Sequence, residues 1–213
     1  MDENAAWELI ARERRAFADV LDGLAPEDWE TPSLCEGWSV QDVVAHTMVG
    51  PTASAREFLA AMLRARFRFD AANRRLTASR RPLGPDGVVA VLREHAESRF
   101  TPPTHDWRAP LTDLLVHRLD ALVPLDVAAP ASLDVWPTVL EFLASPKALR
   151  GFLTAPLPDL TFAATDVEWG SGTGARVEAP AEVLALAMTR RHTSRLDELT
   201  GPGSQVLRTW AAR

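Results

Sequence analysis

Two aspartate–histidine pairs in the sequence have the spacing of metal ligands on a helix. Asp42 precedes His46 by four residues, and Asp113 precedes His117 by the same interval. Residues four apart share one face of a helix, so both side chains of a pair can point at one ion. Neutral imidazole and carboxylate suit zinc and other divalent first-row ions. Two such helices packed together could bring three or four ligands into the core of a bundle, where bundle metal sites are usually built.

Spacing alone leaves other interpretations of these residues open. A single histidine on an apolar helical face, such as His46, is usually a core residue. Ser39 and Asp42 approximate a capping box at a helix start, which accounts for Asp42 without a metal. Asp120 follows His117 by three residues and could orient its imidazole, although an ordinary surface charge explains it equally well.

The sequence contains one cysteine, Cys35, which excludes an intrachain disulfide and any site built from several cysteines. It lies in a loop just before a helix N-terminus, where a thiolate can be stabilised. Glu36 beside it has the opposite effect, so we expect a buried, unreactive thiol. Any metal must therefore be held by His, Asp and Glu.

Eight arginines lie between residues 56 and 81, and "RARFRF" interleaves some of them with aromatics. This pattern is compatible with a nucleic-acid surface or a local site for a carboxylate. We expect instead that the arginines form a solvated helix face. The apolar residues of the same segment then predict a stripe turned to the core: Phe58, Leu59, Met62, Leu63 and Phe67.

Composition places the chain among ordinary globular proteins. It has 213 residues, of which 46% are hydrophobic and 24% charged, enough for one domain or a domain with an appendage. The net charge of −6 argues against bulk attraction to nucleic acid. No apolar run approaches the ~18 residues of a membrane span, and the N-terminus lacks the order of a signal peptide. We expect a cytoplasmic protein without a membrane partner. The abundance of Arg and Ala fits a GC-rich genome.

The elements that position the candidate ligands are mostly helices. Apolar periodicity predicts helices over residues 4–23, from 39 to a stop or kink at 50–51, from 52 to about 78 without a break, over 87–100 and over 111–123. His46 belongs to the second of these helices, and Asp113 and His117 belong to the last. We expect an antiparallel helical bundle of residues 1–125.

The pattern changes after roughly residue 130. Short helices are expected at 135–144 and 147–153, and residues 159–169 are prone to form a strand. "GSGTG" then predicts a turn, with "ARVEA" as the returning strand of a β-hairpin. Further helices follow over 180–191 and on both sides of the break at 201–203. Residues 126–213 are thus expected to form a small α+β segment packed on the bundle.

Three stretches resemble the mycothiol-dependent maleylpyruvate isomerase family, part of the DinB-like group of metal-binding four-helix bundles. They are "LAPEDWETPSLCEGWSVQDVVAH", "APLTDLLVHRLD" and "LTFAATDVEWGSGTGARVEAPAEVLALAMTRR", and together they touch most of the chain. The resemblance implies a mainly α fold, a DinB-like antiparallel four-helix bundle with a small C-terminal α+β segment. It also implies a triad of metal ligands, most often occupied by zinc: His46, Asp113 and His117.

The resemblance further implies an activity. A thiolate, that of mycothiol, adds to a small electrophilic substrate at the metal. In an isomerase it then leaves after rotation about a double bond, and in an S-transferase it stays attached. The partners are then a small-molecule thiol and an electrophile in an actinobacterial cytoplasm, with no nucleic acid and no membrane, and the protein is a monomer or homodimer. The alternative is a metal- or ligand-binding module without catalysis.

The sequence departs from the family pattern at three places. Asp113 stands where the characterised isomerase type uses Glu, which makes this ligand one methylene shorter. "AMTRR" lacks a glycine before the final arginine, and "VEAP" replaces an expected "V-x-G-P". These departures concern the substrate more than the fold.

Overall fold

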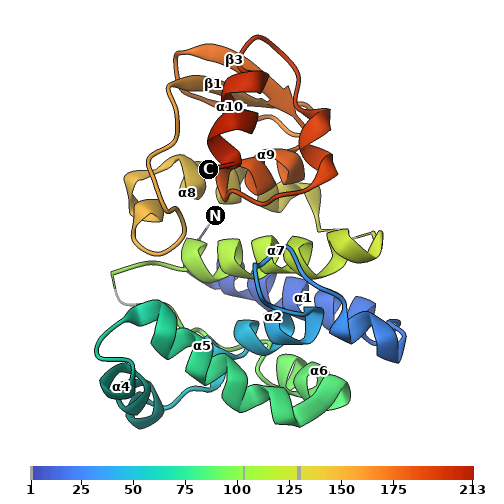
Figure 1. Ribbon diagram of the computed structural model, residues 1–213, viewed down its shortest axis with the longest axis vertical. Coiled ribbons are helices and arrows are strands. Elements are labelled where there is room, and N and C mark those ends of the chain that lie inside the picture. Colours follow the sequence, from blue (N-terminus) through green and yellow to red (C-terminus); the bar gives the residue numbers. More distant parts are fainter. Residues whose placement is uncertain (1, 103, 129–130) are drawn as a thin grey trace. The chain divides into compact units, whose positions relative to one another are not determined.

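The computed structural model describes residues 2–102, 104–128 and 131–213, and its elements are mainly helices (Figure 1). The α-helices are α1 (Glu3–Leu21), α2 (Val40–Thr47), α3 (Val49–Thr52), α4 (Ala55–Arg64), α5 (Phe69–Arg80), α6 (Gly84–Glu94), α7 (Arg108–Leu122), α8 (Trp136–Ala144), α9 (Ala181–Met188) and α10 (Ser204–Ala211). The strands are β1 (Leu160–Ala164), β2 (Gly170–Ser171) and β3 (Ala175–Ala179). The expected fold class, mainly α with a small strand-containing segment, is confirmed.

The chain divides into two compact units. One comprises Met1–Pro110 and Asp120–Ala129, and the other comprises Leu111–Leu119 and Pro130–Arg213. The domain boundary expected between residues 125 and 126 stays a prediction.

The first unit is organised around α1, α2, α5 and α6. Helix α1 packs against α6, and α2 packs against both α5 and α6. The Asp2 carboxylate accepts the N–H of Ala5 and so caps the start of α1. The face of α1 that enters the core carries large apolar side chains, among them Trp7, Ile10 and Phe17. Burial of each such side chain contributes roughly 1.5–3 kcal/mol.

A buried arginine closes this unit over a long sequence separation. Arg14 of α1 is 4% exposed. Its guanidinium donates to the carbonyl oxygens of Ala96, at 2.9 Å, and Ser98, at 2.7 Å. These bonds fix the turn that follows α6 onto α1, because a buried guanidinium is stable only with its donors satisfied.

The helix expected without a break from residue 52 to about 78 is interrupted, so that prediction is wrong. Helix α4 ends at Arg64 and α5 begins at Phe69. Arg66 and Phe67 between them have left-handed backbone angles, with φ of 53° and 58°. Neither residue is a glycine, so each conformation costs roughly 1–2 kcal/mol. Breakers such as Gly or Pro are absent here, and the sequence pattern therefore gave no signal of the break.

The apolar stripe expected to enter the core on α4 is mostly outside it. Leu59 and Leu63 are each 56% exposed, Phe67 is 68% exposed and Phe58 is 39% exposed. The small residues Ala61 and Ala65 are buried instead, in a cluster with Val49, Ala72 and Leu76. The prediction of a core stripe is wrong for four of its five members. We call these four residues the α4 ridge: Phe58, Leu59, Leu63 and Phe67.

The second unit contains a three-stranded sheet in the order β2-β1-β3. Strand β1 pairs antiparallel with β2 and parallel with β3, with Leu160 opposite Ala175 and Ala164 opposite Ala179. The prediction that "ARVEA" returns as the second strand of a hairpin is therefore wrong. The antiparallel return is the two-residue β2, inside the segment expected as a turn, and the chain reverses again before β3.

Glycines make this double reversal possible. Gly172 has φ of 94°, a conformation that side chains disfavour, and a Cβ there would collide with the carbonyl oxygen of Leu160. A Cβ at Gly174 would likewise collide with the carbonyl oxygen of Asp159. The turn thus runs so close to the start of β1 that it tolerates no side chain.

Helix α9 is the core of the second unit. It packs against α8, α10, β1 and β3, and seven of its residues are buried, from Ala181 to Met188. A helix that is apolar on all sides belongs in an interior, which matches these contacts. In Figure 1, α9 and α10 are drawn beside the strands β1 and β3.

Candidate metal centre

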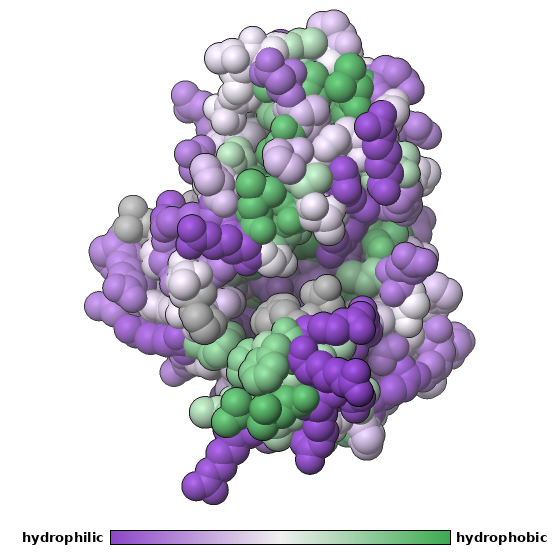
Figure 2. Space-filling model, turned by 60° about the vertical axis from the view of Figure 1, so that its left-hand side comes forward, coloured by the Kyte–Doolittle hydropathy of each residue, from purple (hydrophilic) through white to green (hydrophobic). Residues whose placement is uncertain are grey.

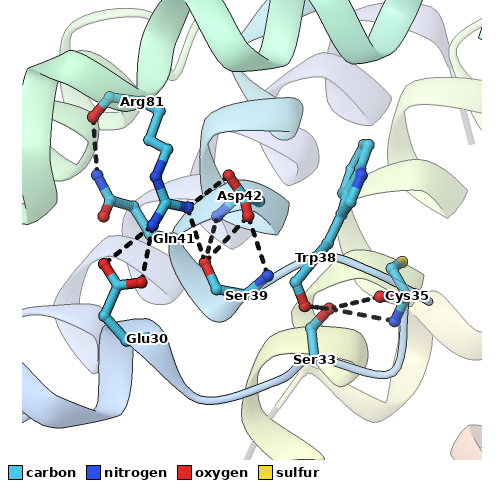
Figure 3. A network of polar contacts seen from close by, with 8 residues as sticks. All are labelled: Glu30, Ser33, Cys35, Trp38, Ser39, Gln41, Asp42 and Arg81. Carbon is cyan, nitrogen blue, oxygen red and sulfur yellow. Dashed lines mark hydrogen bonds and ion pairs between the residues drawn. The ribbon is translucent and has the colours of Figure 1, made fainter. Parts of the chain in front are cut away.

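The start of α2 is fixed by a capping box and an ion pair. The Ser39 hydroxyl accepts the N–H of Asp42, and the Asp42 carboxylate accepts the N–H of Ser39 at 3.0 Å. The Arg81 guanidinium donates to Asp42 at 2.7 Å and also to both oxygens of Glu30 (Figure 3). Asp42 is therefore a capping residue, as expected from the sequence, and its carboxylate is already occupied.

This environment holds the pKa of Asp42 below its ordinary value. Burial is the largest single influence and acts in the opposite direction, raising the pKa. The Ser39 N–H and hydroxyl and the Arg81 guanidinium together outweigh burial, because all of them favour the charged carboxylate. The box consequently anchors α2 as an anionic cap.

His46 lies in the last turn of α2, between an aromatic ring and a hydroxyl. Its ring centroid is 5.2 Å from that of Trp38, with the planes tilted by 58°. Its Nδ1 lies 3.4 Å from Oγ1 of Thr77, a residue of α5 that is 3% exposed. A partner at Nδ1 fixes the orientation of the imidazole and leaves Nε2 for other bonds.

Asp113 and His117 lie one turn apart on α7. The Asp113 carboxylate Oδ1 is 3.5 Å from His117 Nε2, and the two side chains are 38% and 12% exposed. The predicted spacing therefore does bring carboxylate and imidazole together on one helix face. Helix α7 begins at Arg108, earlier than expected, because its first turn includes the Ala109–Pro110 segment predicted as loop.

Asp120 is buried rather than an ordinary surface charge, so that interpretation is wrong. It is 0% exposed. Its Oδ2 accepts the Cys35 thiol at 3.1 Å, and its carbonyl oxygen accepts the N–H of Leu34. Cys35 is half-buried, not fully buried as expected. A buried carboxylate needs donors, and the thiol supplies one of them.

Two overlapping sets of possible metal ligands occur among the described residues. One is His46, Asp113 and His117, and the other is Cys35, His117 and Asp120. In each set, the candidate ligand atoms all lie within 4.8 Å of one another. His117 belongs to both sets. The first set holds the three ligands implied by the resemblance, and Asp42 is in neither.

The chemistry of the first set suits a divalent ion. Two imidazoles and one carboxylate form a neutral-nitrogen and oxygen donor group typical of zinc. Three protein ligands leave a coordination position for a water or a thiolate. Thr77 and Trp38, which contact His46, were missed by sequence reasoning, since neither residue lies at a metal-ligand spacing.

A mainly α, DinB-like fold with inward histidines and carboxylates defines the class of metal-binding helical bundles. The family model of the mycothiol maleylpyruvate isomerase N-terminal domain matches residues 10–162. The chain belongs to this family.

Solved structures support the same fold. A crystal structure of the mycothiol-dependent maleylpyruvate isomerase superposes with a TM-score of 0.57 at 16% sequence identity, over 96% of this chain and 94% of that one. A histidine-to-alanine mutant of the same enzyme matches with the same values. At this identity the likeness shows the fold alone. No curated protein sequence matches the chain significantly.

Proposed function

We propose that the protein is a divalent-metal-binding enzyme that uses a small thiol, mycothiol, in an isomerase or S-transferase reaction on a small electrophile. The observation that carries the proposal is the first ligand set, His46, Asp113 and His117, in a chain of this family. The ion we propose is zinc, and we expect it to act in the cytoplasm. No helix among the described residues is long and apolar enough to cross a membrane.

The proposed role of the three ligands is to hold the ion and leave one position open. When bound, zinc would lower the pKa of a thiol in that position and so favour the nucleophilic thiolate. Thr77 keeps the His46 ring oriented through Nδ1, and the bulk of Trp38 lies against the same ring. Asp113 is shorter than glutamate but still presents a carboxylate within reach of His117.

The proposed reaction divides at one point. The thiolate sulfur adds to an electrophilic carbon and forms a C–S bond, and the displaced electron pair is held by the substrate. In the isomerase version, rotation follows, the C–S bond breaks and the thiol is released unchanged. In the transferase version the C–S bond remains, and a proton is added at the neighbouring carbon.

Metal content tests the ligand set directly. We would measure zinc, nickel, manganese and iron by elemental analysis on tag-free protein purified without chelator, for the wild type and for His46→Ala, Asp113→Ala and His117→Ala. We expect about one divalent ion per chain in the wild type and its loss in each variant. His95→Ala, a histidine outside both sets, should keep the ion.

A wild type that contains no ion and takes up none on dialysis against zinc, nickel or manganese would contradict the site. If the ion is present, consumption of mycothiol with a panel of electrophiles tests the activity. Isomerisation without net thiol loss identifies an isomerase, and stoichiometric thiol loss a transferase. Metal-loaded protein that shows neither reaction would favour a binding module without catalysis.

A further inference from the structure

The α4 ridge presents large apolar side chains to solvent where a helix normally presents polar ones. Leu59 and Leu63 are each 56% exposed, whereas Ala61 and Ala65 face the body of the unit at 5% and 7%. Large residues outside and small residues inside reverse the usual amphipathic arrangement. Contiguous exposed apolar side chains of this kind mark interaction sites in proteins that are otherwise well packed.

Arginines surround the ridge. Arg56 and Arg64 on α4, and Arg66 and Arg68 in the turn after it, are all exposed. Residues 56–81 carry eight arginines against two acidic residues, although the whole chain has a net charge of −6. Figure 2 turns the side that carries α4 forward, and hydrophobic side chains gather there at the lower edge beside strongly hydrophilic ones.

The backbone of the turn keeps one ridge residue outward. Phe67 has φ of 58° and is 68% exposed. Its N–H donates to the carbonyl oxygen of Met62 at 2.8 Å, so the turn is a defined hydrogen-bonded structure. A left-handed non-glycine conformation is unfavourable, and such strain concentrates at functional segments. Here the strained residue is also the most exposed large apolar one of the ridge.

We propose that the α4 ridge and its arginines form a docking surface for an anionic lipid bilayer. Leucine and phenylalanine side chains enter the boundary between headgroups and acyl chains, and the flanking guanidinium groups pair with headgroup phosphates. Clusters of about four to eight basic residues on an amphipathic helix are typical of binding to anionic lipids. This surface goes beyond the proposed thiol chemistry, and it departs from the expectation of no membrane partner.

Other occupants fit the surface less well. A second copy docked through the same face would bring the arginines of one copy against those of the other. A nucleic acid would pair with the arginines, but it would leave Leu59 and Leu63 in water. Lipid acyl chains are the partner that removes the leucines from water while anionic headgroups meet the charges.

Vesicle flotation tests the proposal on the full-length protein. We would use vesicles of phosphatidylcholine alone and of phosphatidylcholine with phosphatidylserine in a two-to-one ratio, at low and high salt. We expect binding to the anionic vesicles that weakens as salt is added, because screening reduces the attraction of the arginines. Binding to the neutral vesicles should be at least about tenfold weaker.

Paired variants separate the ridge from general stickiness. Leu59→Gln with Leu63→Gln should abolish detectable binding, while Leu133→Gln, at the same 56% exposure elsewhere in the chain, should leave it unchanged. Arg64→Gln with Arg68→Gln should weaken binding about thirtyfold. Arg150→Gln is the matched control for charge. Circular dichroism and thermal unfolding of each variant report whether it is folded.

Three results would overturn the proposal. The first is a wild type that does not float with anionic vesicles at low salt. The second is binding that the leucine and arginine variants retain at full strength. The third is a concentration-dependent dimer, or binding to a single-stranded oligonucleotide, that the ridge variants remove while vesicle binding is absent.

Discussion

At the scale of single residues, the Thr77 hydroxyl is the contact that orients His46. Thr77 is 3% exposed, and its Oγ1 lies 3.4 Å from Nδ1 of the imidazole. Partners of this kind fix the tautomer and the ring orientation of histidine ligands, and their loss typically weakens metal binding. The hydroxyl matters more than the volume of the side chain, because valine has nearly the same shape.

Thr77→Val should therefore weaken zinc affinity by roughly 10- to 100-fold. Thr77→Ser, which keeps the hydroxyl, should bind zinc within a few fold of the wild type. Competition with a chromogenic chelator measures both affinities at one pH. Equal affinities of the valine and serine variants would show that the packing of Thr77, and not its hydroxyl, supports His46.

The ligand candidates were accessible from the sequence, but much of their surroundings was not. The four-residue spacings of the Asp–His pairs are visible in any helix, and the capping role of Asp42 was predicted and is confirmed. The burial of Asp120 was not predicted, because a charged residue is normally on the surface and its thiol donor is 85 residues away. Thr77 gave no signal at all, since a threonine in an Arg-rich helix resembles a solvated residue.

At the scale of elements, the cap of α2 makes stability depend on pH. The pKa of Asp42 is lower in the folded chain than its ordinary value near 3.9. A depressed carboxylate pKa stabilises the fold above the unfolded pKa, and this stability is lost as pH falls through the folded pKa. The charge, rather than the cap geometry, is responsible, since asparagine is also a competent cap.

Asp42→Asn should lower the free energy of unfolding by roughly 1 kcal/mol at neutral pH. The difference from the wild type should shrink as pH falls below about 4, where the wild-type carboxylate becomes protonated. Urea unfolding at a series of pH values measures both terms. A difference that stays constant down to about pH 2 would mean that the charge of Asp42 has no part in it.

The turn between β1 and β3 depends on a glycine for two separate reasons. Gly172 has a positive φ of 94°, and a Cβ there would also meet main-chain atoms of Leu160. Gly151 has a positive φ of 117° but open space around a Cβ. Gly172→Ala should thus destabilise the protein by at least about 2 kcal/mol more than Gly151→Ala, measured by urea unfolding. Equal effects would show that the turn can move away from β1.

Element identities were largely predictable, whereas their interruptions and pairings were not. The 3.6-residue apolar period predicts α1, α6 and α7 within a few residues of their observed bounds. The break at Arg66 and Phe67 has no Gly or Pro to announce it. The parallel pairing of β1 with β3 depends on a return strand of two residues, too short to be recognised by period-two alternation.

At the scale of the whole molecule, a bound ion should couple to stability. A ligand that binds the folded chain alone stabilises it, by about 4 kcal/mol when its concentration is 1,000 times the dissociation constant. Zinc should therefore raise the midpoint of thermal unfolding of chelator-treated protein, and removal of zinc should lower it. His117→Ala should lose the zinc-dependent rise, while His95→Ala should keep it. A rise of equal size in both variants would mean that the ion binds elsewhere.

The sheet has a consequence for the order of folding. Its parallel strands are only 15 positions apart, with Leu160 opposite Ala175, whereas parallel pairs usually enclose a long crossover. Short loops close quickly and at little entropic cost, but the bonds of Arg14 join residues 82 and 84 positions apart. In pulsed hydrogen exchange during refolding, the amides of β1 and β3 should gain protection before those at the contact of α1 with α6. The C-terminal sheet would then be an early nucleus, complete before the N-terminal helices have met.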